Sequence, residues 1–578
     1  MAKNTRWDIK PEGEKTIVTE LTKQLSIATP LSNLLVQRGI DTFEKAKEFF
    51  RPKLTELHDP FLMKDMDVAI ERIERALGDG EKILIYGDYD VDGTTAVSLV
   101  YSFFSKQTDN IDYYIPDRYG EGYGISFKGI DYAEENDISL IIALDCGIKA
   151  NEKVDYANEK NIDFIICDHH RPGEKLPAAV AILDPKRDDC NYPYDELCGC
   201  GIGFKLVQAF SQKNELPFDD LLQYLDLAAI SIGCDIVPIT GENRILAYHG
   251  LHQVNNNPRT GIRCMLALVK LKKALTITDL VFVIGPRINA AGRIDHAKKA
   301  VQLLISDKET DALKIGKLIN KDNQDRRELD KTITQNALAM VEDVDSLLNA
   351  KSCVLHSSEW HKGVIGIVAS RVIETYYRPT IILTSDGETA SGSARSVKGF
   401  DVYNAIEKCS DVITQFGGHM YAAGLTLPKK NINAFRKKFE EVVSSTITEE
   451  QLTPVLEIDS ELDLIEITPK FFRILSQLAP FGPKNMRPTF ITRKVLDSGY
   501  SRTIGADNSH LKLSIYQAGN TKLRMDGIGF SMGLRYPKIA TGVPFDIVYT
   551  IEENKWNGNV TLQLNIKDIR SAHKPREK

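Results

Sequence analysis

The chain has 578 residues, 42% of them hydrophobic and 26% charged, and because a single core stops growing near about 250–300 residues, we expect three or four domains. Its formal net charge of −7 at pH 7 excludes a uniformly basic coat for nucleic acid but is compatible with a local basic groove. No run approaches the roughly 18 apolar residues of a membrane span and the N-terminus lacks the apolar core of a signal peptide, so we expect a cytoplasmic protein.

Residues 1–78 are predicted to form a helical extension of short helices with polar breaks. The last segment, MDVAIERIERALGDG, places Ile70, Ile73 and Leu77 on one helical face, and we expect this helix to stop at Gly78. The extension therefore ends where a strand-rich region begins.

Residues 79–240 alternate between short β-branched runs and helical segments. The predicted strands are residues 83–87, 112–116, 140–145, 163–168 and 179–184. Helical segments at 94–106, 126–136 and 151–160 separate most of these strands, and further helical segments follow at 201–213 and 221–235. Near-continuous apolar strands separated by helices predict a parallel sheet with both faces covered.

Residues 241–347 are predicted to form a helical region that connects two lobes. A loop around GPRINAAGR precedes a long amphipathic segment, residues 306–346, which has no proline and no glycine after Gly316. The apolar residues that recur at near-helical spacing in this segment are Leu318, Leu329, Ile333, Ala337 and Met340. We expect one long connecting helix.

A second α/β domain is expected over residues 348–447, where strand-like runs and helices alternate again. After a linker rich in Thr and Glu, residues 455–570 contain closely spaced strand-like runs, which predict a small β-barrel. The expected fold class is therefore α/β: a parallel-sheet domain joined by a long helix to a second α/β domain, plus a C-terminal β-barrel.

The nine cysteines form no repeating framework, as expected for reduced thiols in a cytosol. Cys190, Cys198 and Cys200 cluster in the sequence, but three thiols without a second matching pair fit a zinc site poorly. We interpret these three as small loop or core residues.

Polar side chains follow the predicted strands at the points where the strands end. They occur in DYDVDG, after LIIAL, in DHH after DFIIC, and at the end of the apolar helix LAAISIGC. In chain order they are Asp88, Asp90, Asp92, Asp145, Asp168, His169, His170 and Asp235. Strand ends of an open α/β sheet face one crevice, where a desolvated acid has to be paired, protonated or metal-bound.

Any one of these acids taken alone is more often a cap or turn residue, and we expect Asp92 to cap a helix that begins at Thr94. The set together favours a metal site, because no comparable set of lysines or arginines lies beside these acids in the sequence. Carboxylates with an imidazole suit Mn²⁺ or Mg²⁺. Two such ions would activate water and offset charge on a phosphate, so the predicted reaction is hydrolysis of a phosphoester or phosphoanhydride.

The same residues resemble a known family. DYDVDG, the Asp after LIIAL, DHH and the Asp of GCDIVP are similar to motifs I to IV of the DHH phosphoesterase superfamily. From about residue 40 to 570 the chain further resembles the RecJ family of bacterial single-stranded-DNA-specific exonucleases, through PDRYGEGYG, GPRINAAGR, WHKGVIGIVASR, GSARS, FGGHMYAAGLTL and LAPFGPKN. The resemblance implies a DHH domain over 79–240, a DHHA1 domain over 348–447 and an OB-fold over 455–570.

The resemblance also implies a site for two divalent ions, Mn²⁺ or Mg²⁺. The residues that match the family's metal ligands are Asp88, Asp90, Asp145, His169 and Asp235, with Asp145 bridging both ions. His170 matches a histidine near the scissile phosphate that stabilises charge or assists the leaving oxygen, and Asp168 is expected to orient its neighbours.

Phosphate contacts are implied in both lobes. The matching positions are Arg118, Arg287 and Asn289 in the first, and Ser393, Arg395, Ser396, Gly417, Gly418 and His419 in the second. Paired glycines beside a histidine let backbone N–H groups approach an anion, although an ordinary glycine turn is the alternative for this motif. In the barrel, Tyr500, Tyr516, Lys512, Lys522 and Arg524 offer stacking and phosphate contacts or form ordinary barrel surface.

The leading hypothesis is a single-stranded-DNA-specific exonuclease that releases 5′-mononucleotides in the 5′→3′ direction by two-metal-ion catalysis and acts in DNA recombination and repair. One alternative is a nano-RNase or phosphodiesterase of short oligonucleotides or cyclic nucleotides, but such relatives are far shorter and lack the N-terminal extension and the barrel. A second alternative, a non-catalytic replication scaffold, is disfavoured because every matched ligand is present. The implied partners are single-stranded DNA, a DNA helicase and single-strand-binding protein, and we expect a monomer without membrane partners.

Overall fold

The computed structural model describes residues 5–271, 273–539, 542–556 and 558–572. The chain divides into two compact units. Asp59–Asp235 and Gly250–Pro454, with the first residues of the chain, form unit 1, and Trp7–His58, Ile236–His249 and Val455–Lys578 form unit 2. None of the helices in the described ranges combines the length and apolar character needed to cross a bilayer.

The first sheet of unit 1 is the predicted parallel sheet. Its strands are β2 (Lys82–Gly87), β3 (Ile111–Tyr114), β4 (Ile138–Leu144), β5 (Asp163–Cys167) and β6 (Ala181–Leu183), in the order β3-β2-β4-β5-β6. All four neighbouring pairs run parallel, which confirms the expected topology. The chain moves from β2 to β3 on one side and then to β4 on the other, so the strand order reverses between β2 and β4. Ligands of open α/β sheets bind at such a point, beyond the carboxyl ends of the strands.

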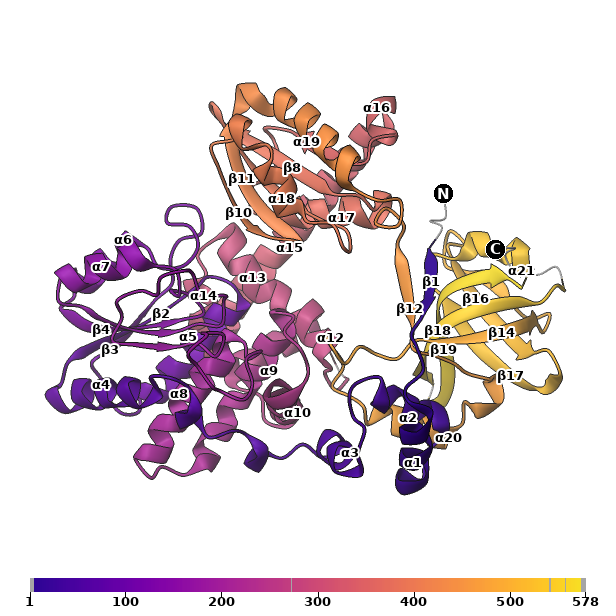
Figure 1. Ribbon diagram of the computed structural model, residues 1–578, viewed down its shortest axis with the longest axis horizontal. Coiled ribbons are helices and arrows are strands. Elements are labelled where there is room, and N and C mark those ends of the chain that lie inside the picture. Colours follow the sequence, from indigo (N-terminus) through magenta and orange to yellow (C-terminus); the bar gives the residue numbers. More distant parts are fainter. Residues whose placement is uncertain (1–4, 272, 540–541, 557, 573–578) are drawn as a thin grey trace. The chain divides into compact units, whose positions relative to one another are not determined.

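Helices cover both faces of this sheet, which explains why its strands are apolar almost throughout. Those on one face are α4 (Met66–Asp79), α5 (Val91–Phe104) and α8 (Gly199–Lys213), and those on the other are α6 (Phe127–Glu135) and α7 (Asn151–Glu159) (Figure 1). Helix α4 continues one residue beyond the predicted stop at Gly78. It ends at Asp79 because Gly80, with φ 67°, provides the left-handed C-cap.

A run of helices follows the parallel sheet. Their bounds are α9 (Leu225–Cys234), α10 (Gly241–Asn256), α11 (Thr260–Val269), α12 (Ile277–Asp279), α13 (Gly285–Ile294), α14 (Lys298–Leu304), α15 (Glu309–Glu342) and α16 (Asp345–Leu348). The expectation of a loop around GPRINAAGR is wrong, since this segment is α13. Pro286 is accommodated in the first turn, where no intrahelical N–H is needed, and the alanines favour a helix.

The long connecting helix is α15, but its buried stripe differs from the predicted one. Ile319 is fully buried, whereas Leu318 is 43% exposed. Ile333 and Ala337 are buried as predicted, with Leu329 and Met340 partly buried against the same cluster. The stripe passes through Ile319 because it follows Ala312 and Gly316 on the side that packs against α11 and α14.

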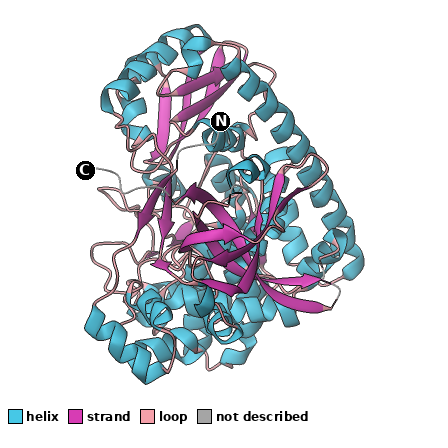
Figure 2. Cartoon of the chain, turned by 90° about the vertical axis from the view of Figure 1, so that its right-hand side faces the viewer, coloured by secondary structure: helices cyan, strands magenta, loops and turns pink. Residues whose placement is uncertain are grey.

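The second sheet of unit 1 contains β7 (Cys353–His356), β8 (Thr380–Asp386), β9 (Thr389–Arg395), β10 (Gln415–His419) and β11 (Ala422–Pro428), in the order β10-β11-β9-β8-β7. Only β7 and β8 pair in parallel. The accompanying helices are α17 (Ile365–Tyr376), α18 (Val402–Glu407) and α19 (Ile432–Thr446). The cartoon coloured by secondary structure shows helices beside the strands (Figure 2), as expected for a second α/β domain.

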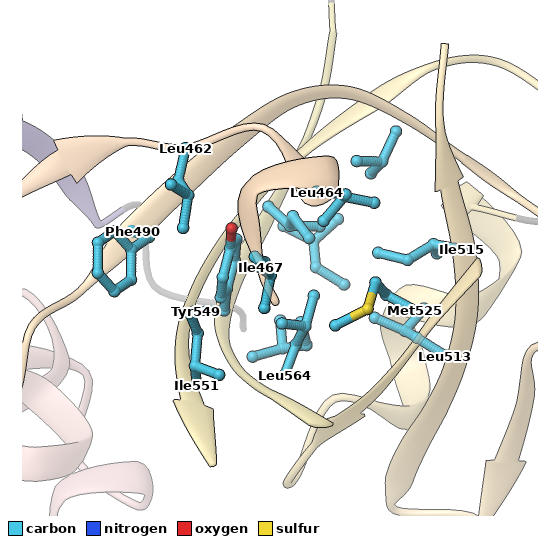
Figure 3. Close-up of a cluster of buried hydrophobic side chains, with 14 of the residues drawn as sticks. Leu462, Leu464, Ile467, Phe490, Leu513, Ile515, Met525, Tyr549, Ile551 and Leu564 are labelled. Atoms are coloured by element: carbon cyan, nitrogen blue, oxygen red, sulfur yellow. The ribbon is translucent and has the colours of Figure 1, made fainter. Parts of the chain in front are cut away.

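Unit 2 contains the predicted β-barrel. Its elements are β13 (Ser460–Glu461), α20 (Pro469–Ser476), β14 (Phe490–Asp497), β15 (Arg502–Ile504), β16 (His510–Gln517), β17 (Asn520–Gly529), α21 (Tyr536–Ile539), β18 (Phe545–Trp556) and β19 (Asn559–Ser571). Strand β14 pairs with both β16 and β18, which closes the barrel, and β17 pairs in parallel with β19. Side chains such as Phe490, Leu513 and Tyr549 fill the interior (Figure 3).

The N-terminal extension is divided between the units. Its elements in unit 2 are α1 (Lys15–Leu25), α2 (Thr29–Val36) and α3 (Phe43–Phe50), and strand β1 (Arg6–Ile9) pairs with β12 (Val455–Ile458). Leu31 and Leu34 of α2 are fully buried in the barrel core. Residues more than 400 positions apart in the sequence therefore share one core.

The three clustered cysteines are free thiols. Cys198 and Cys200 are buried, and Cys190 is half-buried. Cys198 caps α8 by accepting the Gly201 N–H at 3.2 Å. These positions agree with the interpretation as small loop and core residues.

Candidate metal centre

The strand-end acids and histidines meet at the carboxyl edge of the parallel sheet, where the strand order reverses. Asp88 follows β2, Asp145 follows β4 and Asp168 follows β5. Asp235 is the last residue of the α9 helix region, at its C-cap. Asp145 has a φ of 59°, which turns the chain sharply as it leaves the sheet.

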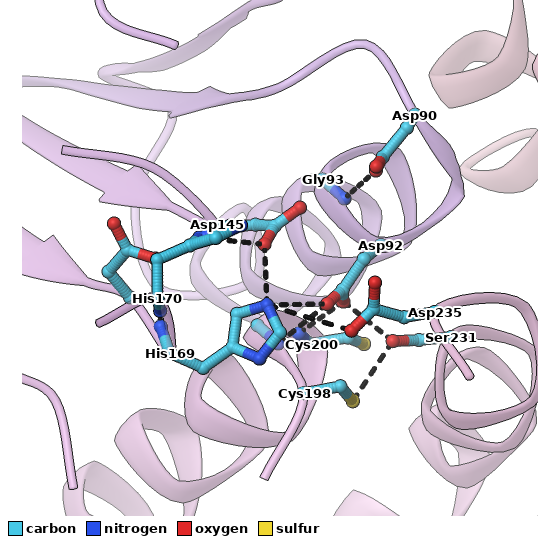
Figure 4. Close-up of polar contacts among 12 residues, drawn as sticks. Asp90, Asp92, Gly93, Asp145, His169, His170, Cys198, Cys200, Ser231 and Asp235 are labelled. Carbon is cyan, nitrogen blue, oxygen red and sulfur yellow. Dashed lines mark hydrogen bonds and ion pairs between the residues drawn. The ribbon is translucent and has the colours of Figure 1, made fainter. Parts of the chain in front are cut away.

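His169 lies among three carboxylates (Figure 4). Its Nε2 is 3.2 Å from Asp145 Oδ1, 3.6 Å from Asp235 Oδ2 and 3.7 Å from Asp92 Oδ2. Two groups of residues have potential ligand atoms that all lie within 4.8 Å of one another: Asp145 with His169 and His170, and Asp92 with His169 and Asp235. The structure therefore brings together residues separated by more than 140 positions in the sequence.

Asp88 and Asp90 lie beside these groups but outside them. Asp88 is fully buried and accepts the Gly124 N–H at 3.3 Å through Oδ1. Asp90 is the N-cap of α5, where its Oδ1 accepts the Gly93 N–H at 3.0 Å. Of the predicted ligands, the structure thus gathers Asp145, His169 and Asp235 around one point and places Asp88 and Asp90 next to them.

The expectation that Asp92 caps a helix starting at Thr94 is wrong, because α5 starts at Val91 with Asp90 as its cap. The Asp92 carboxylate instead accepts the Gly199 and Cys200 N–H groups of α8, both at 2.7 Å, and the Ser231 hydroxyl at 2.6 Å. It therefore ties the N-terminus of α8 to the centre. Its place as the third acid of DYDVDG was the sequence signal for a role in the site.

Burial dominates the electrostatics of the carboxylates. It raises the pKa of Asp145, and the neighbouring Asp92 and Asp90 raise it further. Burial likewise raises the pKa of Asp88 and Asp235, again reinforced by nearby carboxylates. For His169, burial lowers the pKa and favours the neutral imidazole that a metal ligand requires.

Asp168 and His170 form a contrasting pair. Asp168 Oδ1 lies 2.7 Å from His170 Nδ1, and it also accepts the N–H groups of His169 and His170. Burial opposes the charge of Asp168, but the hydrogen bond from His170 prevails and lowers the pKa of this acid to about 2. Burial also opposes a charge on His170, yet Asp168 raises the pKa of this imidazole to about 9.

A divalent cation fits this donor set. Three buried atoms of the centre have no hydrogen-bond partner among the described residues, namely Asp88 Oδ2, Asp145 Oδ1 and His169 Nδ1. Unpaired buried oxygens and repelling carboxylates are costly, and a cation relieves both costs. Oxygen ligands with one or two imidazoles match the preferences of Mn²⁺ and Mg²⁺.

A cavity of about 240 Å³ within unit 1 contains three of the predicted phosphate contacts, Arg118, Ser393 and Arg395. Tyr89, which stands between Asp88 and Asp90 in the chain, lines the same cavity and so links it to the centre. The guanidinium of Arg118 lies 4.6 Å from the centroid of the Tyr89 ring.

Two further cations of this cavity were not predicted from the sequence, Arg293 and Lys362. Arg293 donates to the Gly363 carbonyl at 2.8 Å, and Tyr119 donates to the Arg293 carbonyl at 2.7 Å. Burial and then the neighbouring Arg118 lower the pKa of Arg293 to about 10. The sequence pattern predicts a loop around GPRINAAGR, and arginine in a loop is mostly exposed, so the pattern does not indicate this burial.

The other predicted phosphate contacts are dispersed. Asn289 lines a separate cavity of about 150 Å³ with Arg293, and Gly417 lines one of about 330 Å³ with Lys362. Arg287 donates to Val283 O and Asn320 Oδ1, and Ser396 donates to Phe400 O, so these side chains serve local structure. Gly418 and His419 are exposed on the β10–β11 hairpin.

Family models match three parts of the chain. Residues 82–232 match the N-terminal domain of the DHH family, residues 349–445 the DHHA1 domain, and residues 458–568 the RecJ OB domain. The fold and the acidic centre therefore define a protein of the DHH class with a DHHA1 domain.

Similarity to individual proteins identifies the family within the DHH class. The chain is 38% identical over 573 residues to the single-stranded-DNA-specific exonuclease RecJ of Bacillus subtilis, covering 98% of this chain and 71% of that protein. It is 32% identical over 532 residues to the RecJ of Escherichia coli, covering 88% and 90%. A crystal structure of RecJ from Thermus thermophilus in complex with Mn²⁺ matches with a TM-score of 0.85 at 25% identity, covering 100% of this chain and 81% of that chain. The chain belongs to the RecJ family, which confirms the resemblance and the expected fold class.

Proposed function

We propose that this protein is a metal-dependent exonuclease that hydrolyses single-stranded DNA in the 5′→3′ direction, releases 5′-mononucleotides and acts in DNA recombination and repair. The observation that carries the proposal is the buried cluster of carboxylates and histidines beside an arginine-lined cavity. Relatives described as single-stranded-DNA-specific exonucleases support the substrate class. The resemblance to the RecJ family implies the direction and the biological setting.

The proposed site would hold two divalent ions, Mn²⁺ or Mg²⁺. The residues that would hold them are Asp88, Asp90, Asp145, His169 and Asp235, with Asp145 at the centre of the set. When bound, the ions supply an activated water molecule and offset the charge that develops on the phosphate. The 3.2 Å distance from Asp145 Oδ1 to His169 Nε2 supports the central position of Asp145.

His170 is proposed to stabilise charge on the scissile phosphate or to assist the departure of the leaving oxygen. It is more exposed than His169, with 36% against 8% of the side chain accessible, so it can meet a substrate at the rim of the centre. Asp168 holds the His170 ring through Nδ1 and therefore orients it.

The cavity lined by Arg118, Ser393 and Arg395 is proposed to hold a phosphate of the strand. Arg395 donates to Ser393 Oγ at 3.1 Å, so the two side chains are already aligned. Guanidinium groups match phosphate oxygens in charge and geometry. Further contacts are proposed for Arg287, Asn289, Ser396, Gly417, Gly418 and His419.

The barrel is proposed to bind the strand outside the centre. Tyr500 is 65% exposed, and the guanidinium of Arg524 lies 5.3 Å from the centroid of its ring. An exposed aromatic ring with an adjacent cation suits base stacking and backbone contact.

We also propose five domains, two protein partners, a monomeric state and a cytoplasmic location. The domain limits are 1–78, 79–240, 241–347, 348–447 and 455–570, and the family-model matches lie close to three of them. A DNA helicase and single-strand-binding protein are the proposed partners, the protein is proposed to be a monomer, and its nine free cysteines support a cytoplasmic location.

The test is product analysis on 5′- and 3′-labelled single strands, matching duplexes and dinucleotides, with Mn²⁺, Mg²⁺ or EDTA. Release of mononucleotides from the 5′ end of long single strands, lost with EDTA and in Asp145→Ala, is the expected result. Cleavage of dinucleotides alone would assign the protein to the nano-RNases. Folded, metal-loaded protein that cleaves none of these substrates would instead be a non-catalytic scaffold.

A further inference from the structure

Tyr123 lies against the imidazole of His170 on the side away from Asp168. The Tyr123 hydroxyl is 3.2 Å from His170 Nε2, and the two rings meet edge to face with centroids 6.0 Å apart. The other ring nitrogen, Nδ1, lies 2.7 Å from Asp168 Oδ1. The imidazole is therefore held at both of its nitrogen atoms.

The partners of Asp168 determine which ring nitrogen carries which role. Its carboxylate accepts the N–H groups of Ile148, His169 and His170, so it acts as an acceptor throughout. The nitrogen that faces it, His170 Nδ1, must then be the donor. Nε2 is then the nitrogen that faces away from Asp168, and it is the one that Tyr123 contacts.

The Tyr123 hydroxyl has a second partner, the Asp145 carbonyl oxygen at 3.4 Å. A hydroxyl is both a donor and an acceptor. It can therefore accept from one neighbour while it donates to the other. Through these two contacts Tyr123 connects His170 to the turn that places the Asp145 carboxylate.

The backbone around Tyr123 is fixed to the centre. Gly122 and Gly124 on either side have φ values of 89° and 78°, a conformation that favours glycine. The Gly124 N–H donates to Asp88 Oδ1 at 3.3 Å, and its carbonyl accepts the hydroxyl of the buried Tyr86 at 3.0 Å. Tyr123 is 55% exposed, but its side chain extends from this anchored backbone, which places the ring edge to face with His170.

We propose that Tyr123 is a positioning residue that fixes the Nε2 side of His170 for phosphodiester hydrolysis. Asp168 and Tyr123 together then set the direction in which Nε2 meets the substrate. This inference rests on the proposed function, because it assigns Tyr123 a part in the same reaction.

The test is a double-mutant cycle on single-stranded DNA with Tyr123→Phe, His170→Ala and the double variant, each with Mn²⁺. Loss of one hydrogen bond that aims a reacting group is expected to lower kcat about tenfold in Tyr123→Phe, with KM unchanged within about twofold. In the double variant the rate is expected to equal that of His170→Ala within about twofold, because Tyr123 acts through His170.

Tyr156→Phe is the matched control, since it removes a tyrosine hydroxyl that bonds Asp131 on α6, outside the centre. It is expected to leave kcat and KM unchanged. Equal unfolding midpoints for wild type and Tyr123→Phe exclude a folding defect as the cause of the lower rate.

Two results would overturn the inference. A tenfold loss that persists in the His170→Ala background would show that Tyr123 acts independently of His170. A rise in KM with unchanged kcat would make Tyr123 a contact of the strand. The wild-type protein tests the proposed function separately. If wild type and Tyr123→Phe cleave DNA equally well, only the role of Tyr123 is rejected. If the wild type is inactive, the proposed function is rejected.

Discussion

Two buried aspartates at neighbouring strand ends, Asp145 and Asp168, differ in what their oxygens contact. Asp168 accepts hydrogen bonds from His170 and from three backbone N–H groups, and its pKa is lowered to about 2. Asp145 Oδ1 has no hydrogen-bond partner among the described residues, and burial among other carboxylates raises its pKa. Hydrogen bonding thus makes Asp168 an orienting group, while Asp145 Oδ1 faces the proposed metal ligand His169 at 3.2 Å from its Nε2.

We predict that Asp168→Asn lowers the exonuclease rate 10- to 100-fold with little change in KM, as expected when a group that orients a catalytic side chain is lost. An amide can place an NH₂ group against the N–H donors that the carboxylate accepted, so His170 loses its fixed orientation. Steady-state kinetics with Mn²⁺ on single-stranded DNA would measure this.

Asp155→Asn is the control for that substitution, since Asp155 is exposed on α7 away from the centre. It should retain the wild-type rate. If Asp168→Asn were equally active, the orienting role of Asp168 would have to be abandoned.

At the scale of elements, the centre depends on how closely α8 approaches the end of β4. Gly199 opens α8 beside Asp145, and a Cβ at Gly199 would lie 2.6 Å from Asp145 Cβ and 2.9 Å from its Oδ1. Asp92 holds the helix there through the Gly199 and Cys200 N–H groups. The helix can be this close only because its first residue has no side chain.

We predict that Gly199→Ala displaces the Asp145 carboxylate and weakens metal-dependent cleavage at least tenfold. The measurement is the Mn²⁺ concentration that gives half-maximal activity, together with the rate at saturation. In Gly199→Ala the Mn²⁺ concentration for half-maximal activity should rise, and the rate at saturating Mn²⁺ should fall.

Gly78→Ala is the matched control, because Gly78 lies within α4 with nothing within 4 Å of the added Cβ. It should leave activity unchanged and stabilise the protein by about 0.5–1 kcal/mol. Wild-type metal dependence in Gly199→Ala would show that Asp145 tolerates the displacement.

Helix α15 offers a comparison of adjacent residues. Ile319 is fully buried and Leu318 is 43% exposed. We predict that Ile319→Ala lowers the free energy of unfolding by about 2–4 kcal/mol, and Leu318→Ala by less than about 1 kcal/mol. Urea unfolding midpoints of the two variants would decide this, and equal midpoints would contradict the burial pattern.

At the scale of the whole molecule, sequence order and core membership diverge. Residues Trp7–His58 cluster with the barrel, while α4 packs on the parallel sheet of unit 1. Leu31 and Leu34 lie in the barrel core, so the extension and the barrel form their core together. The metal centre belongs entirely to unit 1.

We predict that Mn²⁺ protects unit 1 and leaves the barrel unchanged. A ligand at 100 times its Kd stabilises the native state by about 2.7 kcal/mol, and here it also relieves repulsion among the carboxylates. Hydrogen exchange followed by mass spectrometry should show that Mn²⁺ slows exchange in peptides from residues 82–235. The exchange rate of peptides from residues 490–571 should not change. In Asp145→Ala the effect should be absent, and uniform protection of both regions would contradict a centre confined to unit 1.

The sequence by itself determined the alternation of strands and helices, the parallel sheet, the barrel and the strand-end acids. Strands are encoded by local residue patterns, and the carboxyl ends of parallel strands lie at one edge of the sheet for any loop conformation. The sequence therefore predicts that four strand-end residues lie close together, namely Asp88, Asp145, Asp168 and His169. The resemblance to the RecJ family added the assignment of individual metal ligands and phosphate contacts. These assignments remain proposals.

Only the tertiary structure decided the contacts made across loops. Asp92 bonds the start of α8 more than 100 residues away, Tyr123 contacts His170, and Arg293 joins the cavity of Arg118 because GPRINAAGR is a helix. These depend on where a loop travels and how deeply a side chain is buried. No repeating residue pattern predicts the path of a loop or the burial of such a side chain, because both are set by packing between segments that are distant along the chain.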